Sequence, residues 1–184
     1  MAKIVAAEYV SLDGVMHDPQ WTSPYFEDEL AKYQHAQLFA SDALLLGRTT
    51  FQEFAGAWPL MEEREGDFAV RMNTMPKFVA SHTLAGALPW NGTLIKGDVS
   101  EAVTALRRRP GGDILIYGSG HLVRTLVEHG LIDRYRVMLF PIVVGHGERL
   151  FGAHRDAGMD ARRTERGRSG RLRRIDVQPL RIPD

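Results

Sequence analysis

Asp113-Ile114-Leu115-Ile116-Tyr117-Gly118-Ser119-Gly120 joins a short, continuous apolar run directly to a glycine turn. Such a run is typical of a strand that is buried on both faces of a sheet. A helical pattern follows at once, with Leu122, Leu126 and Val127 on its apolar face, and Gly130 closes it. The sequence therefore predicts a strand–turn–helix unit, the repeating element of α/β proteins.

Further strand candidates lie on both sides of this unit. Each is a short run rich in apolar residues and bounded by glycine, proline or polar turn residues. We expect strands at Ile4–Val10, Ala43–Gly47, Lys77–Ser81, Thr93–Lys96 and Tyr135–Val144, the last broken at Pro141, and one later strand within Leu172–Ile182.

Helices are expected between these strands. Ser23 followed by Pro24 predicts a helix over about Pro24–Ala40. Thr49–Phe54 reads as a short helix stopped by Gly56. Asp98 and Glu101 have capping-box spacing, and the helix that they begin must end at the proline and glycines of 110–112. Alternating strands and helices predict a largely parallel sheet covered on both faces.

Composition limits the classes of protein to consider. The 184 residues suit one domain, 1–184, and 44% hydrophobic with 25% charged residues is typical of a folded globular chain. The absence of cysteine excludes disulfides and thiolate sites and is compatible with a cytoplasmic location. Glu8 interrupts the first apolar run, so we expect neither a signal peptide nor a membrane span.

Net charge is zero, but the segment 155–174 holds eight arginines against three acidic residues. A run of this kind is usually a solvated face or a mobile segment, and contact with phosphate or RNA is the less favoured alternative. The histidines show no metal-ligand spacing, so no metal is expected. Neither nucleic acid nor a membrane is an expected partner.

Three of the predicted strand ends carry residues that suit anions. In an open α/β sheet, ligands bind at the carboxyl ends of strands, where helix N-termini offer unpaired amides. The ends are Gly118-Ser119-Gly120, Gly47-Arg48-Thr49-Thr50 and Ser81-His82-Thr83. Taken singly, each can be a tight turn, a capping threonine or a surface cation. Three in one domain favour an extended dinucleotide.

The ordered motifs resemble a known superfamily. Ser11-Leu12-Asp13-Gly14, the Gly47–Phe51 segment, Ile116–Leu122 and Pro141–Phe151 follow one another as in dihydrofolate-reductase-like proteins. More closely, the chain resembles stand-alone relatives of the C-terminal reductase domain of riboflavin-biosynthesis deaminase-reductases, over roughly residues 3–152.

This resemblance implies a three-layer fold, with a twisted, mostly parallel eight-stranded sheet and helices on both faces. It implies a homodimer that binds NADPH and delivers hydride to a small heterocyclic, imine or carbonyl substrate. By this resemblance, the pyrophosphate would lie at Gly118, Ser119, Gly120 and Leu122, and the other side of the cofactor would be held by Gly47, Arg48 and Thr50. The 2′-phosphate would lie near Ser81 and His82. The loop over the nicotinamide would contain Asp13 and Gly14.

The substrate side departs from the family pattern. Riboflavin reductases resemble one another in a lysine after the Ser-Leu-Asp-Gly turn, an Asp-Asp-Pro stretch and a glutamate before the glycine turn. This chain has Val15, Ala57-Trp58-Pro59 and Tyr117 at those positions. The arginine-rich segment 155–174 also departs, since the family usually closes with two alternating antiparallel strands. The riboflavin intermediate is therefore in doubt as the substrate.

Candidate substrate and proton-transfer residues lie near the first predicted helix. Dihydrofolate reductase holds its pterin with a carboxylate on this helix, so Asp28 or Glu27 can play that part; the alternative is that both complement the helix dipole. An aromatic slot for a flat substrate would comprise Trp21, Tyr25, Phe51, Trp58 and Tyr117, although such residues are more often core. Dihydrofolate reductase proper and a catalytically silent nucleotide-binding module remain the alternative functions.

Overall fold

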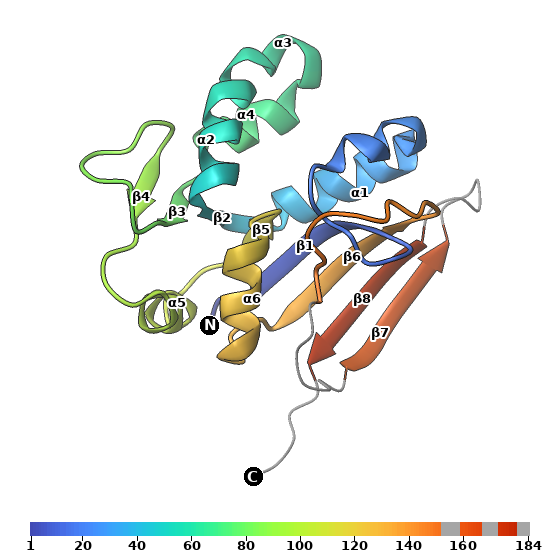
Figure 1. Ribbon diagram of the computed structural model, residues 1–184. Coiled ribbons are helices and arrows are strands. Elements are labelled where there is room, and N and C mark those ends of the chain that lie inside the picture. The colour runs from blue at the N-terminus through green and yellow to red at the C-terminus, as the bar shows by residue number, and fades with distance from the viewer. Residues whose placement is uncertain (152–158, 167–172, 180–184) are drawn as a thin grey trace.

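One sheet of eight strands organises the chain (Figure 1). The computed structural model describes residues 1–151, 159–166 and 173–179. The strand order is β4-β3-β2-β5-β1-β6-β8-β7. The parallel part has six strands, and β8 and β7 add to β6 in antiparallel fashion. The bounds are β1 Ile4–Ser11, β2 Ser41–Gly47, β3 Lys77–Ala80, β4 Gly92–Leu94, β5 Asp113–Tyr117, β6 Arg134–Phe140, β7 Met159–Arg166 and β8 Arg173–Pro179.

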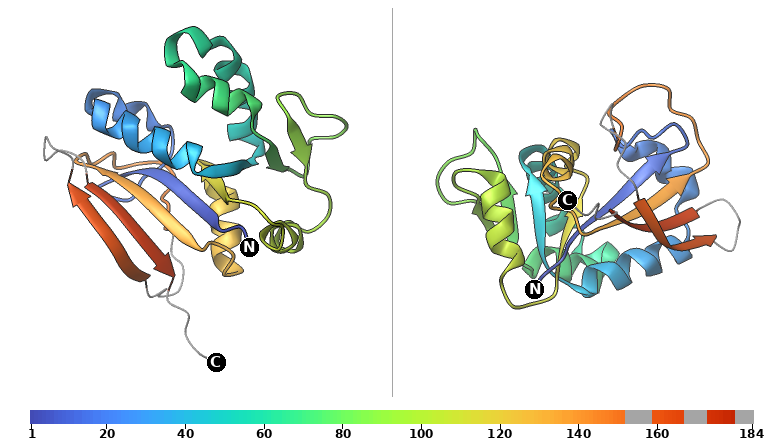
Figure 2. Two further views of the ribbon diagram at one scale, coloured as in Figure 1. Left: turned by 180° about the vertical axis from the view of Figure 1, so that it is seen from behind. Right: turned by 90° about the horizontal axis from the view of Figure 1, so that it is seen from below.

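Helices cover both faces of this sheet, as the two further views show (Figure 2). Leu30 of α1, Phe51 of α2 and Met72 of α4 pack on one face, whereas Leu106 of α5 and Leu126 of α6 pack on the other. The fold is therefore the predicted three-layer α/β class. The bounds are η1 Pro19–Tyr25, α1 Asp28–Phe39, α2 Arg48–Ala57, η2 Trp58–Leu60, α3 Glu62–Glu65, α4 Asp67–Thr74, α5 Val99–Arg107 and α6 Gly120–Glu128.

Strand residues alternate between the two cores. Along β1, Ile4 and Ala6 belong to the core under α5 and α6, and Val5 and Ala7 to the core under α1, α2 and α4. These four side chains are at most 3% exposed. Burial on both faces explains why the inner strands read as continuous apolar runs.

The expected helix over Pro24–Ala40 was wrong at its start. Ser23 and Pro24 lie inside the 3₁₀ helix η1, and the backbone is extended at Glu27, the N-cap of α1. A proline that suits the first turn of an α-helix also suits a 3₁₀ turn, so the local signal did not separate them. Gly56 does not stop α2, which continues to Ala57.

Three other elements were not predicted from the sequence. The short helices α3 and α4 lie in a segment that we had not assigned, and β7 lies within the arginine-rich segment. The pairing of β7 with β8 supplies the two antiparallel strands that the family pattern expects. By contrast, the capping box was correct, because the Asp98 carboxylate accepts a hydrogen bond from the Glu101 amide at 3.0 Å.

Lys77, at the start of β3, is a fully buried cation. Its Nζ donates to the Asn73 carbonyl oxygen at 3.0 Å and lies 4.0 Å from the Trp90 ring centroid. Burial lowers the pKa of Lys77 from 10.5 to about 8. The unfolded chain therefore binds more protons than the folded chain between about pH 8 and pH 10.5.

This difference predicts that the free energy of unfolding contributed by Lys77 rises with pH across that window. In Lys77→Met the rise should be missing when urea unfolding is followed from pH 7.5 to pH 10. Lys96→Met, which removes an exposed lysine, is the control and should keep it. Identical pH dependence in native protein and Lys77→Met would contradict the burial argument.

Candidate functional site

A cleft of about 1310 Å³ runs along the carboxyl ends of four neighbouring strands, β3, β2, β5 and β1. Its lining includes the turns that follow β3, β2 and β5, together with residues 7–9 of β1. Helices α1, α2 and α4 form the walls at one end. This is the position at which open α/β sheets bind ligands.

Two helices begin side by side in this cleft. The Gly47 amide donates to the Ser119 Oγ at 3.0 Å, and the Ser119 amide donates to the Thr50 Oγ1 at 3.1 Å. These reciprocal bonds join the turn before α2 to the turn before α6. Gly118 has φ of +55°, and a Cβ there would lie 3.3 Å from the Thr50 hydroxyl, so glycine permits the close approach.

The Ser119 hydroxyl is already engaged within these turns. Ser119 Oγ donates its proton to the Tyr117 carbonyl oxygen at 3.1 Å, so it has no second proton for a phosphate. Neither N-cap residue, Gly47 nor Ser119, caps its helix with a side chain. The first backbone amides of α2 and α6 therefore remain available, and they supply donors and partial positive charge for an anion.

The turn after β3 forms the far end of the cleft. Ser81 Oγ accepts hydrogen bonds from the Thr83 and Leu84 amides at 3.1 and 3.0 Å, which fixes the turn. His82 and Arg48 are exposed and line the cleft, and Arg48 Nη1 donates to the Gln52 Oε1 at 3.0 Å. The predicted cofactor residues of the three strand ends thus share one cleft, and Leu122 lines it too.

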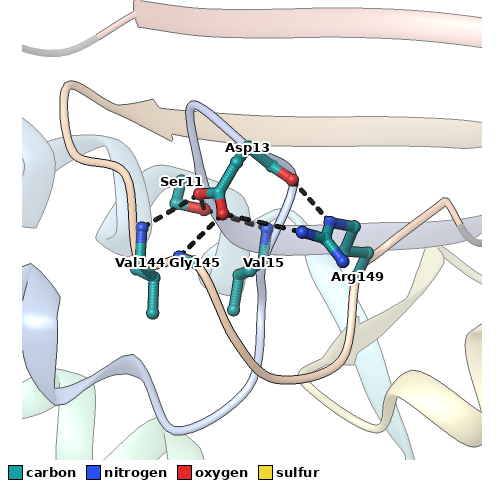
Figure 3. Close-up of polar contacts among 6 residues, drawn as sticks. All are labelled: Ser11, Asp13, Val15, Val144, Gly145 and Arg149. Atoms are coloured by element: carbon teal, nitrogen blue, oxygen red, sulfur yellow. Dashed lines mark hydrogen bonds and ion pairs between the residues drawn. The ribbon is translucent and has the colours of Figure 1, made fainter.

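Asp13 and Gly14 do not line this cleft. The Asp13 carboxylate accepts hydrogen bonds from Ser11 Oγ at 2.7 Å and from the Val144 and Gly145 amides at 3.0 and 2.8 Å (Figure 3). Arg149 Nε donates to the Asp13 carbonyl oxygen at 2.9 Å. Asp13 thus joins two loops, and the cleft-lining residues of its own loop are Met16 and His17, so the place of Asp13 and Gly14 over the nicotinamide stays a prediction.

The proposed aromatic slot is only partly present. Trp58 and Tyr117 line the cleft. Phe51 is 2% exposed and packs in the core, while Trp21 and Tyr25 make edge contacts with the Phe140 ring. Apolar packing against the sheet, the alternative considered from the sequence, accounts for these three rings.

The candidate acids Asp28 and Glu27 also lie outside the cleft lining. Glu27 is the N-cap of α1 and Asp28 is exposed in its first turn. Their position suits complementation of the helix dipole. The α1 residues that line the cleft come from the following turns: Ala31, Lys32, Gln34 and His35.

Sequence reasoning missed several polar residues of the cleft. Glu8 and Tyr9 of β1 line it, and the Tyr9 hydroxyl accepts a hydrogen bond from Gln34 Nε2 at 2.5 Å. His35 Nε2 lies 2.9 Å from the Asp67 carboxylate at the opposite wall. The only available sequence signal was Glu8, a carboxylate inside an otherwise apolar strand.

The described part of the chain lacks two kinds of feature. No group of three or more histidine, aspartate or glutamate side chains there is arranged to hold a metal ion. Within the same residues, no helix has both the length and the apolar character that crossing a membrane requires.

Comparison with known proteins gives one family. Residues 2–170 match the model of the RibD C-terminal domain. The uncharacterized protein YyaP of Bacillus subtilis is 30% identical over 112 residues, which are 60% of this chain and 59% of that protein. The aligned part thus spans less than two thirds of that relative.

Solved structures share the fold. A putative riboflavin biosynthesis protein from Shewanella sp. PV-4 has a TM-score of 0.75 at 21% identity, with 98% of this chain and 100% of that chain covered. The deaminase/5-amino-6-(5-phosphoribosylamino)uracil reductase of Thermotoga maritima has a TM-score of 0.69 at 15% identity, with 97% of this chain and 57% of that chain covered. A pyrimidine reductase-like protein from Corynebacterium diphtheriae has a TM-score of 0.68 at 15% identity, with 98% and 93% covered.

The bonds around Asp13 predict a change of stability with acid. The hydrogen bond from Ser11 and those from the Val144 and Gly145 amides lower the pKa of Asp13 from 3.8 to about 2. A depressed folded-state pKa contributes stability that is present above pH 3.8 and lost as the pH falls through about 2.

We therefore expect Asp13→Asn to lower the melting temperature at neutral pH and to flatten its dependence on pH between 4 and 2. Asp18→Asn, at an exposed position nearby, should leave both unchanged. Thermal unfolding followed by circular dichroism checks this. An unaltered melting temperature in Asp13→Asn would mean that the loop contacts do not stabilise the fold.

Proposed function

This chain belongs to the RibD C-terminal domain family, and from that membership we propose that it is an NADPH-dependent reductase of a small heterocyclic or imine substrate. The family supports a reductase-like role. The observation that carries the cofactor proposal is the pair of uncapped helix N-termini held together by Ser119 and Thr50.

A dinucleotide suits this arrangement for a geometric reason. Its pyrophosphate carries two neighbouring anionic groups, and the first turns of α2 and α6 offer two neighbouring sets of amides. The cleft continues past them in both directions, toward the Ser81 turn on one side and toward β1 on the other. The two halves of an extended cofactor can therefore occupy the two directions.

The choice of NADPH over NADH rests on Arg48 and His82. Both line the part of the cleft nearest β3 and are exposed, so a 2′-phosphate there meets a guanidinium, an imidazole and the Thr83 hydroxyl. When bound, this cofactor supplies the hydride. The protein's own part is to orient cofactor and substrate and to provide a proton.

The substrate half has a different electrostatic character. Two basic side chains, Lys32 and His35, line it. Three carboxylates line it as well, those of Glu53, Glu65 and Asp67. The Asp67 carboxylate contacts His35. This mixture does not favour a phosphate group on the substrate. Trp58, Phe54 and Phe68 add apolar wall, so we propose a flat heterocycle without a phosphorylated sugar.

Cofactor preference is the first test of this proposal. NADPH should bind at least about tenfold more tightly than NADH, equivalent to roughly 1.4 kcal/mol. Arg48→Gln should reduce that ratio by weakening NADPH alone, because only NADPH carries the 2′-phosphate. Fluorescence titration of both nucleotides measures it, and equal affinities in the native protein would remove Arg48 and His82 from this role.

A second test concerns the turn before α6. The Gly120→Val side chain would meet the Glu148 Oε2 and the Met16 Sδ, each 3.2 Å from the Cβ position. Both are ends of flexible side chains, so the fold should survive while the added bulk obstructs the backbone amides. We expect NADPH affinity to fall at least about tenfold.

Gly56→Val is the matched control, since it places the same side chain in a helix where nothing lies within 4 Å. It should bind NADPH as the native protein does. Native affinity in a folded Gly120→Val would show that the pyrophosphate lies elsewhere.

The alternatives are separated by turnover. A dihydrofolate reductase would oxidise NADPH with dihydrofolate, and a riboflavin-type enzyme with the phosphoribosylaminouracil substrate. The changed residues Val15, Trp58 and Tyr117 motivate a third possibility, a nucleotide-binding module without turnover. Tight NADPH binding without oxidation across pterins, pyrimidines, quinones and imines would support the third.

A further inference from the structure

Glu8 is a buried carboxylic acid at the floor of the cleft. It lies on β1 between the buried Ala7 and the half-buried Tyr9, and Glu8 itself is 2% exposed. The strand β1 is central in the sheet, paired with β5 on one side and β6 on the other. Because Ala7 pairs with Tyr117, Glu8 lies level with Gly118, where β5 has ended and the turn toward α6 begins.

The hydrogen bonds of this carboxyl are incomplete. The Gly118 amide donates to it, whereas Oε1 is buried and has no hydrogen-bond partner among the residues that the structure describes. A buried oxygen without a partner is destabilising by about 1–3 kcal/mol. A group that enters the cleft and hydrogen-bonds Oε1 would relieve this penalty.

Burial disfavours the charged form of Glu8. It raises the pKa well above the ordinary value, and the opposing influence is the hydrogen bond from Gly118. The titratable groups that line the same part of the cleft are Tyr9 of β1 itself, Tyr117 of the neighbouring β5, His121 of α6, and His17 and Glu148 of the loops. Neither lysine nor arginine is among them, but Arg124 of α6 contacts the Glu148 carboxylate at 3.2 Å, and His121 lies 3.0 Å from the same carboxylate. A bound pyrophosphate would further disfavour the ionised carboxylate.

From this geometry we propose that Glu8 is the proton donor of the reduction, in contact with the substrate beside the nicotinamide at the β1 end of the cleft. This inference rests on the proposed reductase function. Asp28 and Glu27, by contrast, lie outside the cleft, and Asp28 is exposed to water.

The chemical step balances with one hydride and one proton. The substrate carbon of a C=N or C=O bond accepts hydride from the nicotinamide, and the π electron pair moves to the nitrogen or oxygen. That atom takes the proton from the Glu8 carboxyl, whose O–H bond breaks and leaves a carboxylate. Water entering the open cleft reprotonates Glu8 after product leaves.

Glu8→Gln tests the proposal, because the amide keeps shape and hydrogen bonding but cannot donate a proton to the substrate. In an assay with whichever compound of the panel the native protein reduces, kcat should fall on the order of 100-fold. The Kd for NADPH should change less than twofold. Native kcat should decline as the pH rises through the pKa of Glu8, since the protonated form is the donor, and Glu8→Gln should lack this decline.

A second measurement needs no turnover. Infrared spectra of native protein with ¹³C-labelled glutamate should show a protonated carboxylic acid at pH 7, and this band should vanish in Glu8→Gln. Glu63→Gln, which removes an exposed glutamate outside the cleft, should retain it. If Glu8→Gln fails to fold, two other measurements test the proposal. One is the pH titration of the carboxylic acid band in native protein, and the other is the dependence of kcat on pH in Glu8→Asp. The aspartate variant should keep the alkaline decline at reduced kcat.

The outcomes separate the two proposals. A native protein that reduces nothing in the panel would refute the reductase function, and the donor role of Glu8 with it. A native protein that turns over, together with undiminished kcat in Glu8→Gln, would overturn the role of Glu8 alone. An ionised Glu8 at pH 7 would overturn that role whatever the activity.

Discussion

The paired hydrogen bonds between Gly47, Ser119 and Thr50 are the constraint on which the site depends. Strands β2 and β5 are neighbours, so the turns that follow them must pass close to one another. Polar side chains at such turns usually cap their own helices. Here they bind the opposite turn, which fixes the two helices relative to each other and leaves the first amides of both facing the cleft.

This exchange explains why the two ends of the cleft differ. Binding through backbone amides requires no particular side chain. In the half that we propose for the cofactor, the first amides of α2 and α6 can therefore donate to an anion even though the Ser119 hydroxyl is hydrogen-bonded within the protein. The half that we propose for the substrate is lined by side chains from α1, α2 and α4, such as Lys32, and by Trp58 of η2. Changes of residue there alter what can be bound while the sheet and its turns stay as they are, which is how one fold can serve several substrates.

Local signals in the sequence predicted the parts of the fold that local chemistry determines. The β5–α6 junction and the Asp98 cap are examples, since each depends on residues within a few positions. The start of α1 was missed because Pro24 suits two kinds of helical turn. The role of Asp13 was beyond prediction from spacing, because its partners Val144 and Gly145 lie more than 130 residues away. Glu8 was read only as an interruption of an apolar strand, since a pattern of residue types does not show which face of a sheet borders a cavity.

Glu8 and Asp28 also show that the role of an acidic residue depends more on the strand or helix that carries it than on how near it lies to a motif in the sequence. Asp28 lies exposed in the first turn of α1 and outside the cleft, so it does not reach a molecule bound there. A carboxyl inside a central strand is shielded from water on both faces, and the backbone amide of one neighbouring turn is too little to compensate for its charge. Burial therefore favours the neutral form, which retains a proton. In this chain the buried carboxyl that borders the cleft therefore comes from the sheet, since the first turn of α1 lies outside the cleft.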